Sequence, residues 1–205
     1  MANMNKNNTS LNKVNSIDMK SLIELRDGRI FYVPAYQRGY RWNEEQVKDL
    51  LDDLYSFATG KNEKQFYCLQ PVIVKEIKKD DPKWREIKEE TPSLSEETSI
   101  YEVVDGQQRL ITLFLILNYL GQSSYKLSFE KRSQSEEFLS NLNHNTYCHN
   151  TPDHHFISKA HEIISNWFEE KSHEDMGYKN RFAVVLGVYH NNAGTGFSLL
   201  PNFGL

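Results

Sequence analysis

The sequence has little of what marks several protein classes. Its only cysteines are Cys68 and Cys148, too few for a disulfide framework, as is usual in a reducing compartment. The longest apolar run, residues 110–120, is too short to cross a bilayer. The N-terminal stretch also lacks the apolar core of a signal peptide. We therefore expect a cytoplasmic protein with no membrane partner.

An excess of positive charge is also missing. The 205 residues include 24 Lys and Arg against 28 Asp and Glu, a net charge of −4, so contact with nucleic acid has to come from a local patch. Neither the G-x-x-x-x-G-K-[ST] phosphate loop nor the G-x-G-x-x-G dinucleotide fingerprint occurs. What is present is ordinary for a globular chain: 39% hydrophobic and 25% charged residues.

Hydrophobic periodicity predicts an α+β fold. Val47, Leu50, Leu51 and Leu54 follow the spacing of an amphipathic helix, and Asn43 begins it with a capping box. The expected elements, in chain order, are a short helix at 17–26, strands at 29–33, 66–77 and 101–104, helices beginning at 43 and 106, a strand at 125–129, helices at 133–142 and 156–168, and a helix or strand at 179–189. A small mixed sheet with packed helices, followed by a helical C-terminal part, accommodates them.

Composition divides the chain further. We expect a disordered leader at 1–15, one domain at 16–130, a helical extension at 131–190 and an irregular tail at 191–205. Within the domain, residues 78–99 are charged and have few apolar side chains, which predicts a solvated loop inserted between two strands. The histidines gathered between 144 and 190 match no standard zinc spacing, and we interpret those in the 141–152 region as part of a polar loop.

The DGQQR turn, residues 105–109, joins a predicted strand to a predicted apolar helix. Asp105 and Gln108 fit a D-x-x-Q capping box, and Gly106 eases the turn, so a purely structural interpretation explains three residues. It does not explain Arg109, a cation in the first turn of a helix, where it opposes the helix dipole. Nor does it explain Gln107 beside Gln108. Capping and function both stay open at this point.

The arginine loop, residues 35–42, is the one stretch of this acidic chain that interleaves basic and aromatic side chains. Its candidate binding residues are Gln37, Arg38, Tyr40, Arg41 and Trp42. Arginine forks suit phosphate oxygens, and aromatic faces suit bases. The alternative is that the aromatic residues are core anchors and the arginines are solvated.

Together the two motifs suggest a site for the phosphates of a nucleotide or nucleic acid. Arg38, Arg41 and Arg109 would neutralise phosphate charge. Asp105 would hold Mg²⁺, since a bare carboxylate repels phosphate. Gln37, Gln107 or Gln108 would orient a water molecule, as a glutamine does in some nucleoside triphosphatases. We expect the two motifs to meet at one end of the sheet.

The motifs also carry a family resemblance. Residues 33–42 (VPAYQRGYRW), 50–54 (LLDDL) and 104–110 (VDGQQRL) together resemble the N-terminal domain of GmrSD-type restriction proteins, also found in SspE-type defence proteins. The resemblance implies a ParB/sulfiredoxin-like core and a DNA-sensing nucleoside triphosphatase of anti-phage defence. With Asp105 as the Mg²⁺ ligand, we expect Mg²⁺-dependent hydrolysis, with GTP or ATP as the nucleotide. The resemblance places Asp105, Gly106, Gln107, Gln108 and Arg109 in a hydrolysis motif, and Gln37, Arg38, Tyr40 and Trp42 in the first motif.

Such proteins continue into a C-terminal HNH-type nuclease domain, and no such domain follows in this sequence, which ends at Leu205. We therefore expect no nuclease activity from this chain, with a nuclease domain or subunit acting in trans as one arrangement. Two other functions remain open. The first is a non-catalytic module that binds DNA or nucleotide phosphates. The second is an interaction scaffold in which the DGQQR turn is merely a cap.

Overall fold

A four-stranded mixed sheet lies at the centre of the fold. The computed structural model describes residues 25, 28–60, 69–91, 94–95, 97–122, 125–142 and 151–174. The strands are β1 (Arg29–Val33), β2 (Ile73–Ile77), β3 (Ser99–Asp105) and β4 (Lys126–Phe129), in the spatial order β2-β3-β1-β4. Strand β1 pairs in parallel with both β3 and β4, whereas β2 runs antiparallel to β3.

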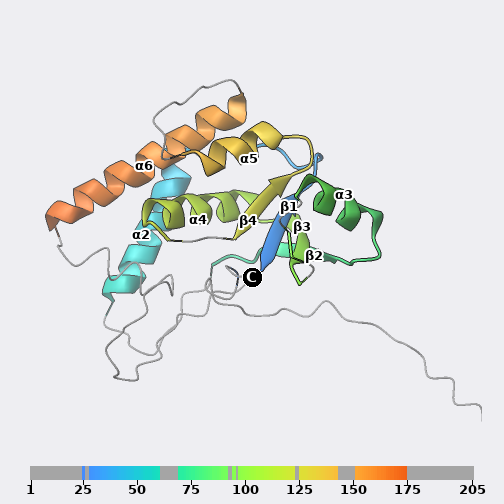
Figure 1. The fold of residues 1–205 in the computed structure, drawn as a ribbon. Helices are drawn as coiled ribbons and strands as arrows, with labels where there is room; N and C mark the ends of the chain where they lie inside the picture. The colour runs from blue at the N-terminus through green and yellow to red at the C-terminus, as the bar shows by residue number, and fades with distance from the viewer. Residues whose placement is uncertain are drawn as a thin grey trace, which may run out of the picture.

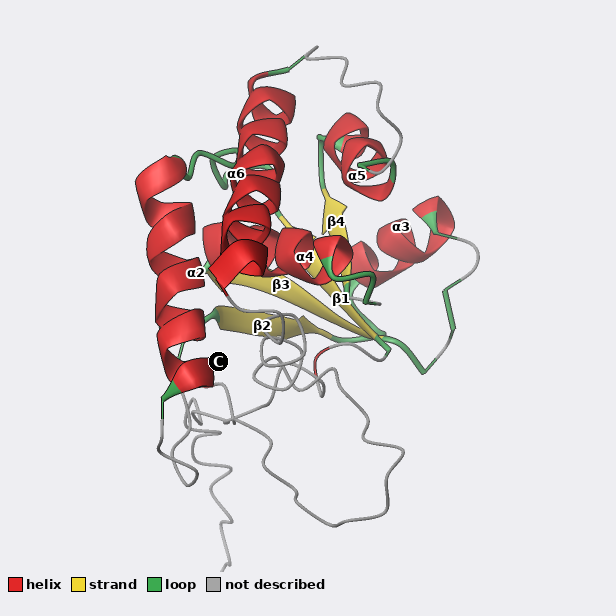
Figure 2. Cartoon of the chain, turned by 90° about the vertical axis from the view of Figure 1, so that its left-hand side faces the viewer, coloured by secondary structure: helices red, strands yellow, loops and turns green. Residues whose placement is uncertain are grey.

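Helices cover both faces of the sheet, but unequally. They are α2 (Glu44–Thr59), α3 (Pro82–Glu90), α4 (Gln107–Tyr119), α5 (Ser133–Ser140) and α6 (Pro152–Glu174). Side chains of α2, α4, α5 and α6 share one hydrophobic core with the sheet, and α3 packs in a smaller core with other strand residues. Figure 1 shows α3 apart from the remaining helices, and Figure 2 shows α2, α4 and α6 gathered on one side of the strands. The predicted α+β class is confirmed.

The strand sequences explain why both faces are covered. In β1, Phe31 and Val33 enter the large core, whereas Ile30 and Tyr32 enter the small one, because successive strand residues point to opposite faces. All four are nearly inaccessible to solvent. A central strand that is apolar on both faces needs a packed layer on each side.

Helix α2 begins where the sequence predicts. The Asn43 side chain accepts a hydrogen bond from the backbone N–H of Gln46, and the Gln46 side chain accepts one from the backbone N–H of Asn43. This capping box fixes the direction in which the chain leaves the arginine loop. Val47, Leu50, Leu51 and Leu54 are all buried, as their spacing predicts.

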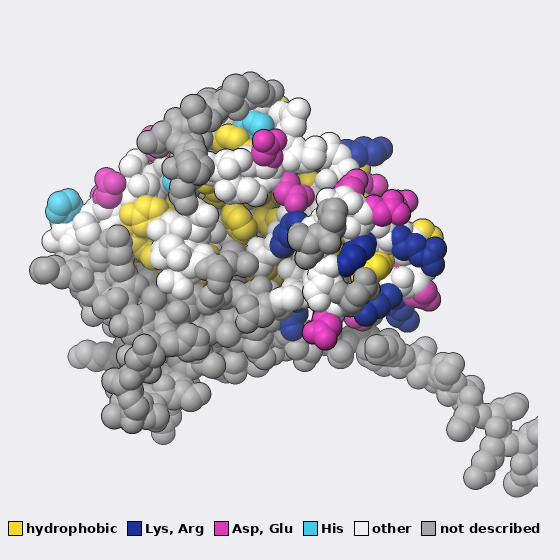
Figure 3. All heavy atoms as spheres, viewed as in Figure 1, with side chains coloured by type: hydrophobic (Ala, Val, Ile, Leu, Met, Phe, Trp, Pro, Cys, Tyr) yellow, Lys and Arg dark blue, Asp and Glu magenta, His cyan; other side chains and the backbone are white. Residues whose placement is uncertain are grey.

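The prediction of a solvated loop at 78–99 is wrong, because this segment contains α3. Asp81 caps the helix by accepting from the backbone N–H of Lys83, and Pro82 occupies its first turn. Trp84 and Ile87 lie three residues apart, one helical turn, and both are buried against the sheet. Arg85, Glu86, Glu89 and Glu90 are exposed, and Figure 3 shows acidic and basic groups clustered in the region of α3.

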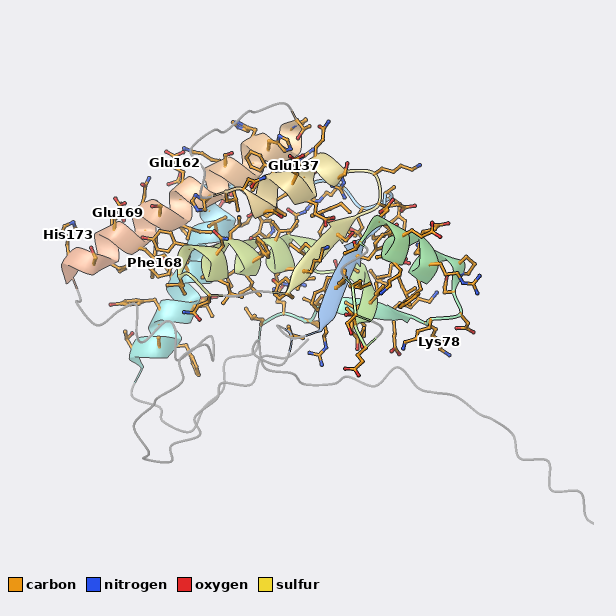
Figure 4. The ribbon with its side chains drawn as sticks, in the orientation of Figure 1. Lys78, Glu137, Glu162, Phe168, Glu169 and His173 are labelled. Carbon is orange, nitrogen blue, oxygen red and sulfur yellow. The ribbon has the colours of Figure 1, made fainter. Side chains whose placement is uncertain are left out.

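The C-terminal part is helical as predicted, but α6 begins earlier than the periodicity indicated. It starts at Pro152 rather than at Phe156. In Figure 4, Glu162, Glu169 and His173 project away from the sheet, whereas Phe168 lies on the core side. Phe168 is fully buried and stacks on Tyr119 of α4, with ring centroids 4.8 Å apart.

The remaining predicted elements are confirmed, begin later than predicted, or lie outside the described residues. The predicted strands at 29–33 and 125–129 correspond to β1 and β4. Of the strand predicted at 66–77, residues 66–68 lie outside the described part, and the described residues form β2 only from Ile73, after Pro71. The predictions for 1–15, 179–189 and 191–205, and for 17–26 apart from Leu25, lie outside the described residues. No described helix combines the length and the apolarity needed to span a bilayer.

Candidate functional site

The two predicted motifs meet at the start of α4. The Gln108 side-chain oxygen accepts hydrogen bonds from the backbone N–H groups of Arg41, at 2.7 Å, and Trp42, at 3.2 Å. Its amide nitrogen donates to the carbonyl of Gly39, at 3.1 Å. One glutamine of the DGQQR turn therefore satisfies three main-chain groups of a loop that lies about 70 residues earlier. The expectation that the motifs come together is confirmed.

Two further glutamines strengthen this junction. Gln107 is 3% exposed and donates from Nε2 to the carbonyl of Arg38, at 2.9 Å. In the reverse direction, Gln37 donates from Nε2 to the carbonyl of Val104, at 2.7 Å. Because the loop and the turn each supply side chains that bind the main chain of the other, their relative position is fixed from both sides.

Asp105 does not cap α4, so the predicted D-x-x-Q capping box is wrong. It is the last residue of β3 and pairs with Ile73 in the ladder. Gly106 takes the N-cap position instead, in a left-handed conformation with φ of 89°, and no described side chain caps the helix. A Cβ at Gly106 would lie 2.9 Å from Val72 Cγ2, so both conformation and space favour glycine here. The Asp105 side chain is left exposed.

Arg109 has a partner that the sequence did not reveal. Its guanidinium donates from Nη1 to the Gln70 side-chain oxygen, at 2.7 Å, and from Nη2 to the Pro71 carbonyl, at 2.6 Å. It thereby ties the segment that precedes β2 to the first turn of α4. The Nε atom is buried and has no hydrogen-bond partner among the described residues.

The aromatic residues of the arginine loop divide into a core anchor and an exposed surface. Tyr40 is 1% exposed, and its hydroxyl lies 2.8 Å from Thr112 Oγ1 of α4. Burial raises the pKa of Tyr40 well above its usual value. Trp42 is half-buried against the large core. Tyr36, by contrast, is 69% exposed and donates its hydroxyl proton to Glu102, at 3.1 Å.

The two arginines of the loop have different surroundings. Arg38 is exposed, and its side chain makes no hydrogen bond or ion pair with any described residue. Arg41 is held by an ion pair between its Nη1 and Asp153 Oδ1, at 2.9 Å, and its guanidinium lies 5.0 Å from the ring centroid of Phe156. Of these two predicted phosphate ligands, Arg38 is the one whose charge is not engaged by the described residues.

Polar groups without a protein partner also occur at the start of α4. The side-chain oxygen of Gln107 is buried and accepts no hydrogen bond from the described residues. Burying such an acceptor without a partner costs free energy, so each case suggests a water molecule or ligand. The uncapped first turn of α4 adds backbone N–H groups at the positive end of its dipole. Within the part of the chain that the structure describes, the start of α4 therefore combines the positive end of a helix dipole with an acceptor, Gln107 Oε1, that has no hydrogen-bond partner.

Sequence reasoning missed Asp153 and Arg132. Asp153, in the first turn of α6, forms a second ion pair with Arg132 Nη1, at 3.0 Å. The signal for the helix start was available, since Thr151 followed by Pro152 is typical of a helix N-terminus. Thr151 Oγ1 indeed accepts from the backbone N–H of His154, at 3.2 Å. Nothing in the sequence pointed to the two pairings, which join Asp153 to Arg132, 21 positions earlier, and to Arg41, 112 positions earlier.

The described residues contain no group of three or more His, Cys, Asp or Glu side chains suited to hold a metal ion by themselves. Residues 143–150, which include two histidines and Cys148, lie outside the described part. Asp105 is an exposed carboxylate at the end of β3. Such a residue suits Mg²⁺, which is commonly bound by one or two carboxylates together with substrate phosphates.

Comparison with known proteins gives one result that covers most of the chain. The family model described as "GmrSD restriction endonuclease, N-terminal domain" matches residues 19–193. No curated protein sequence matches the chain. The matched range includes the arginine loop, the DGQQR turn, and the three residues Arg41, Arg132 and Asp153.

Proposed function

The chain belongs to the GmrSD restriction endonuclease N-terminal domain family, and on this premise we propose that it binds and hydrolyses a nucleoside triphosphate within an anti-phage restriction system. One observation carries the proposal. The glutamines of the DGQQR turn hold the main chain of the arginine loop, so two polar motifs form one rigid junction. Rigid placement of charged groups is what phosphoryl transfer requires of a protein.

Arg38 and the start of α4 would bind the phosphates. The Arg38 carbonyl is fixed by Gln107, while its guanidinium is exposed and unengaged by the described residues. A guanidinium forms paired hydrogen bonds with phosphate oxygens. The N-terminus of α4, where Gly106 takes the N-cap position and no described side chain caps the helix, adds backbone donors and the positive end of a helix dipole. We assign both to phosphate binding.

Asp105 fits a role in holding Mg²⁺. Its carboxylate is exposed at the end of β3, next to the uncapped helix start. When bound, the ion would neutralise phosphate charge and polarise the reacting phosphoryl group. The carboxylate of Asp105 alone would repel the phosphates, and a Mg²⁺ ion held by it would offset that repulsion.

Gln107 would position the attacking water. Its Nε2 donates to the Arg38 carbonyl, which fixes the orientation of the amide, and its buried Oε1 has no hydrogen-bond partner among the described residues. An oriented amide oxygen accepts a hydrogen bond from the water molecule and so directs a lone pair of the water oxygen toward the phosphorus. The amide is too weak a base to remove the proton. Gln108 has no such freedom, since both ends of its amide bind the loop.

A second candidate function is binding of nucleotide or DNA phosphates without hydrolysis. It is favoured by the engagement of Gln108 and Arg109, both predicted as catalytic. Gln108 holds the arginine loop, and Arg109 holds Gln70 and Pro71. In this alternative the DGQQR turn builds the site, while Arg38 and the helix start retain a phosphate group. Tyr36, exposed beside them, suits contact with a base.

The test measures binding and phosphate release with GTP, ATP, CTP and UTP, with and without Mg²⁺ and DNA. Arg38→Ala and Asp105→Ala are compared with Arg85→Ala and Asp80→Ala, which remove the same side-chain types from exposed positions on and beside α3. Mg²⁺-dependent release that is lost in the first pair and kept in the second supports hydrolysis. Binding without release supports the alternative, and absence of binding to any nucleotide or DNA contradicts both.

A further inference from the structure

The carboxylate of Asp153 joins three segments that are distant in sequence. Its Oδ1 pairs with Arg41 of the arginine loop, at 2.9 Å, and its Oδ2 pairs with Arg132, at 3.0 Å, directly before α5. The Asp153 side chain is 9% exposed, against 34% for Arg41 and 21% for Arg132. Ion pairs this sheltered from water are more sensitive to loss of one partner than surface pairs are.

Gly39 brings the loop backbone against the same carboxylate. A Cβ at Gly39 would lie 1.8 Å from Asp153 Oδ1 and 2.8 Å from Oδ2, well inside contact distance. Gly39 does not have a positive φ, so its backbone conformation is open to alanine and only the lack of space excludes a side chain. The loop and the first turn of α6 therefore touch at a point where even a methyl group is not accommodated.

Two further contacts bind the loop to this carboxylate group. The Arg41 guanidinium lies over Phe156, one turn further along α6. Arg132, besides its ion pair, donates from Nη2 to the carbonyl of Gln37, at 3.4 Å. The arginine loop is thus held on one side by Gln107 and Gln108 of α4, and on the other by the group of Asp153, Arg41 and Arg132.

We propose that Asp153 is a positioning residue for the candidate site, acting through Arg41, Arg132 and the close contact with Gly39 to fix the loop that carries Arg38. The proposal rests on the function proposed above. It assigns α6 a part in that function, since this helix supplies the carboxylate that fixes the loop on the side opposite α4. Asp153 itself pairs with two arginines and needs no contact with the nucleotide.

Loss of the carboxylate has a defined consequence. The partly buried guanidinium groups of Arg41 and Arg132 would lose their shared anion and repel each other. Arg41 belongs to the arginine loop, and Arg132 donates to the Gln37 carbonyl of that loop, so the repulsion would act on the loop. Gln107 and Gln108 would still hold the loop from the α4 side. We therefore expect a folded protein whose loop is displaced, with phosphate release reduced on the order of tenfold to a hundredfold, as small misplacements of reacting groups produce.

The main test compares Asp153→Asn, Asp153→Ala and Gly39→Ala with the control Trp167→Phe. Trp167 donates to Asp52 at 2.8 Å and so joins α6 to α2, away from the arginine loop. The expected result is a lower kcat in the Asp153 and Gly39 variants, with a smaller change in KM, because binding by Arg38 is misdirected rather than abolished. Trp167→Phe loses stability but keeps kcat. Equal effects in the control and in Asp153→Asn would overturn the proposal.

A double-mutant cycle shows whether Gly39 and Asp153 act through one contact. Alanine at Gly39 would already displace the carboxylate, so adding Asp153→Ala to Gly39→Ala should change kcat little further. If the two losses multiply, the residues act independently and the positioning role is contradicted. Melting temperature and circular dichroism of each variant establish that the comparison is among folded proteins.

Trypsin gives a readout that needs no activity. It cleaves after arginine, and Arg38 is exposed in the loop. In Asp153→Asn, native-state cleavage after Arg38 or Arg41 should rise several-fold relative to wild type and to Trp167→Phe. Unchanged cleavage at these bonds contradicts the proposal. If the wild-type protein binds no nucleotide, the proposed function fails by itself, and the cleavage pattern still decides whether Asp153 holds the loop.

Discussion

Removing the side-chain amide of Gln108 is the most informative change to the junction between the two motifs. Gln108→Ala eliminates three hydrogen bonds, two from the N–H groups of Arg41 and Trp42 and one to the carbonyl of Gly39. Each such bond contributes about 0.5–1.5 kcal/mol net. Water reaches part of this half-buried site and replaces some of the loss, so we expect a decrease of about 2 kcal/mol in the free energy of unfolding.

The matched control is Gln46→Ala, which removes a glutamine from the start of α2. Gln46 accepts one exposed hydrogen bond from its own capping box, at 2.9 Å, so its loss should cost about 0.5 kcal/mol. Urea unfolding of both variants, followed by circular dichroism, gives the two values. Hydrogen exchange adds a local measurement, because the N–H groups of Arg41 and Trp42 should exchange faster in Gln108→Ala alone. Equal destabilisation of the two variants would refute the reasoning.

Three further predictions concern other parts of the molecule. Gly106→Ala should destabilise the protein by more than about 2 kcal/mol, and Gly121→Ala by about 1 kcal/mol, as measured by thermal unfolding. Both glycines have a positive φ, but only at Gly106 would the added methyl group clash with Val72. Burial raises the pKa of Tyr40, so the contribution of its neutral hydroxyl to stability is complete below the unfolded pKa of about 10 and is lost as pH rises above that value. The free energy of unfolding, measured with urea from pH 9 to 11, should therefore fall less steeply in Tyr40→Phe than in the wild type. An unchanged slope contradicts this. Trp84→Ala should cost about 3 kcal/mol in urea unfolding and Arg85→Ala under about 0.5 kcal/mol, whereas equal values would mean that α3 is not packed.

The features that the sequence predicts well are local or strongly periodic. The capping box of Asn43 and Gln46 lies within one helical turn, and the four leucine and valine positions behind it repeat at helical spacing. Strand β1 is apolar after its first residue, Arg29, and Pro34 follows its last residue, so both of its ends can be predicted from the sequence. In these cases the residues that decide the structure are neighbours in sequence.

The predictions that failed depended on contacts between distant segments. Asp105 has the sequence of an N-cap, but pairing with Ile73 keeps it in β3, and Gly106 makes the turn instead. In α3 only Trp84 and Ile87 are buried, so the periodic signal was too short to be recognised among charged residues. Asp153 acquires its two arginine partners only when α6 folds back onto the arginine loop.

The contact between the two motifs of the candidate site was predictable from the sequence, but the role of each arginine was not. The sequence indicates that the arginine loop and the DGQQR turn belong together, and the structure brings them into direct contact. Which arginine remains available could not be predicted, because Arg38, Arg41 and Arg109 are chemically alike. Their difference arises from what surrounds them: Asp153 holds Arg41, Gln70 and Pro71 hold Arg109, and Arg38 remains exposed.

The most direct test of the account is amide NMR of the full chain titrated with Mg²⁺ and a slowly hydrolysed nucleoside triphosphate analogue. The central claim is that residues 35–42 and 105–109 form one nucleotide site. Resonances of both segments, with Arg38 and Gln107 prominent, should shift together along one saturation curve, and Arg38→Ala should weaken both sets of shifts equally. Shifts confined to one segment, or located at other elements while both segments stay unchanged, would contradict it.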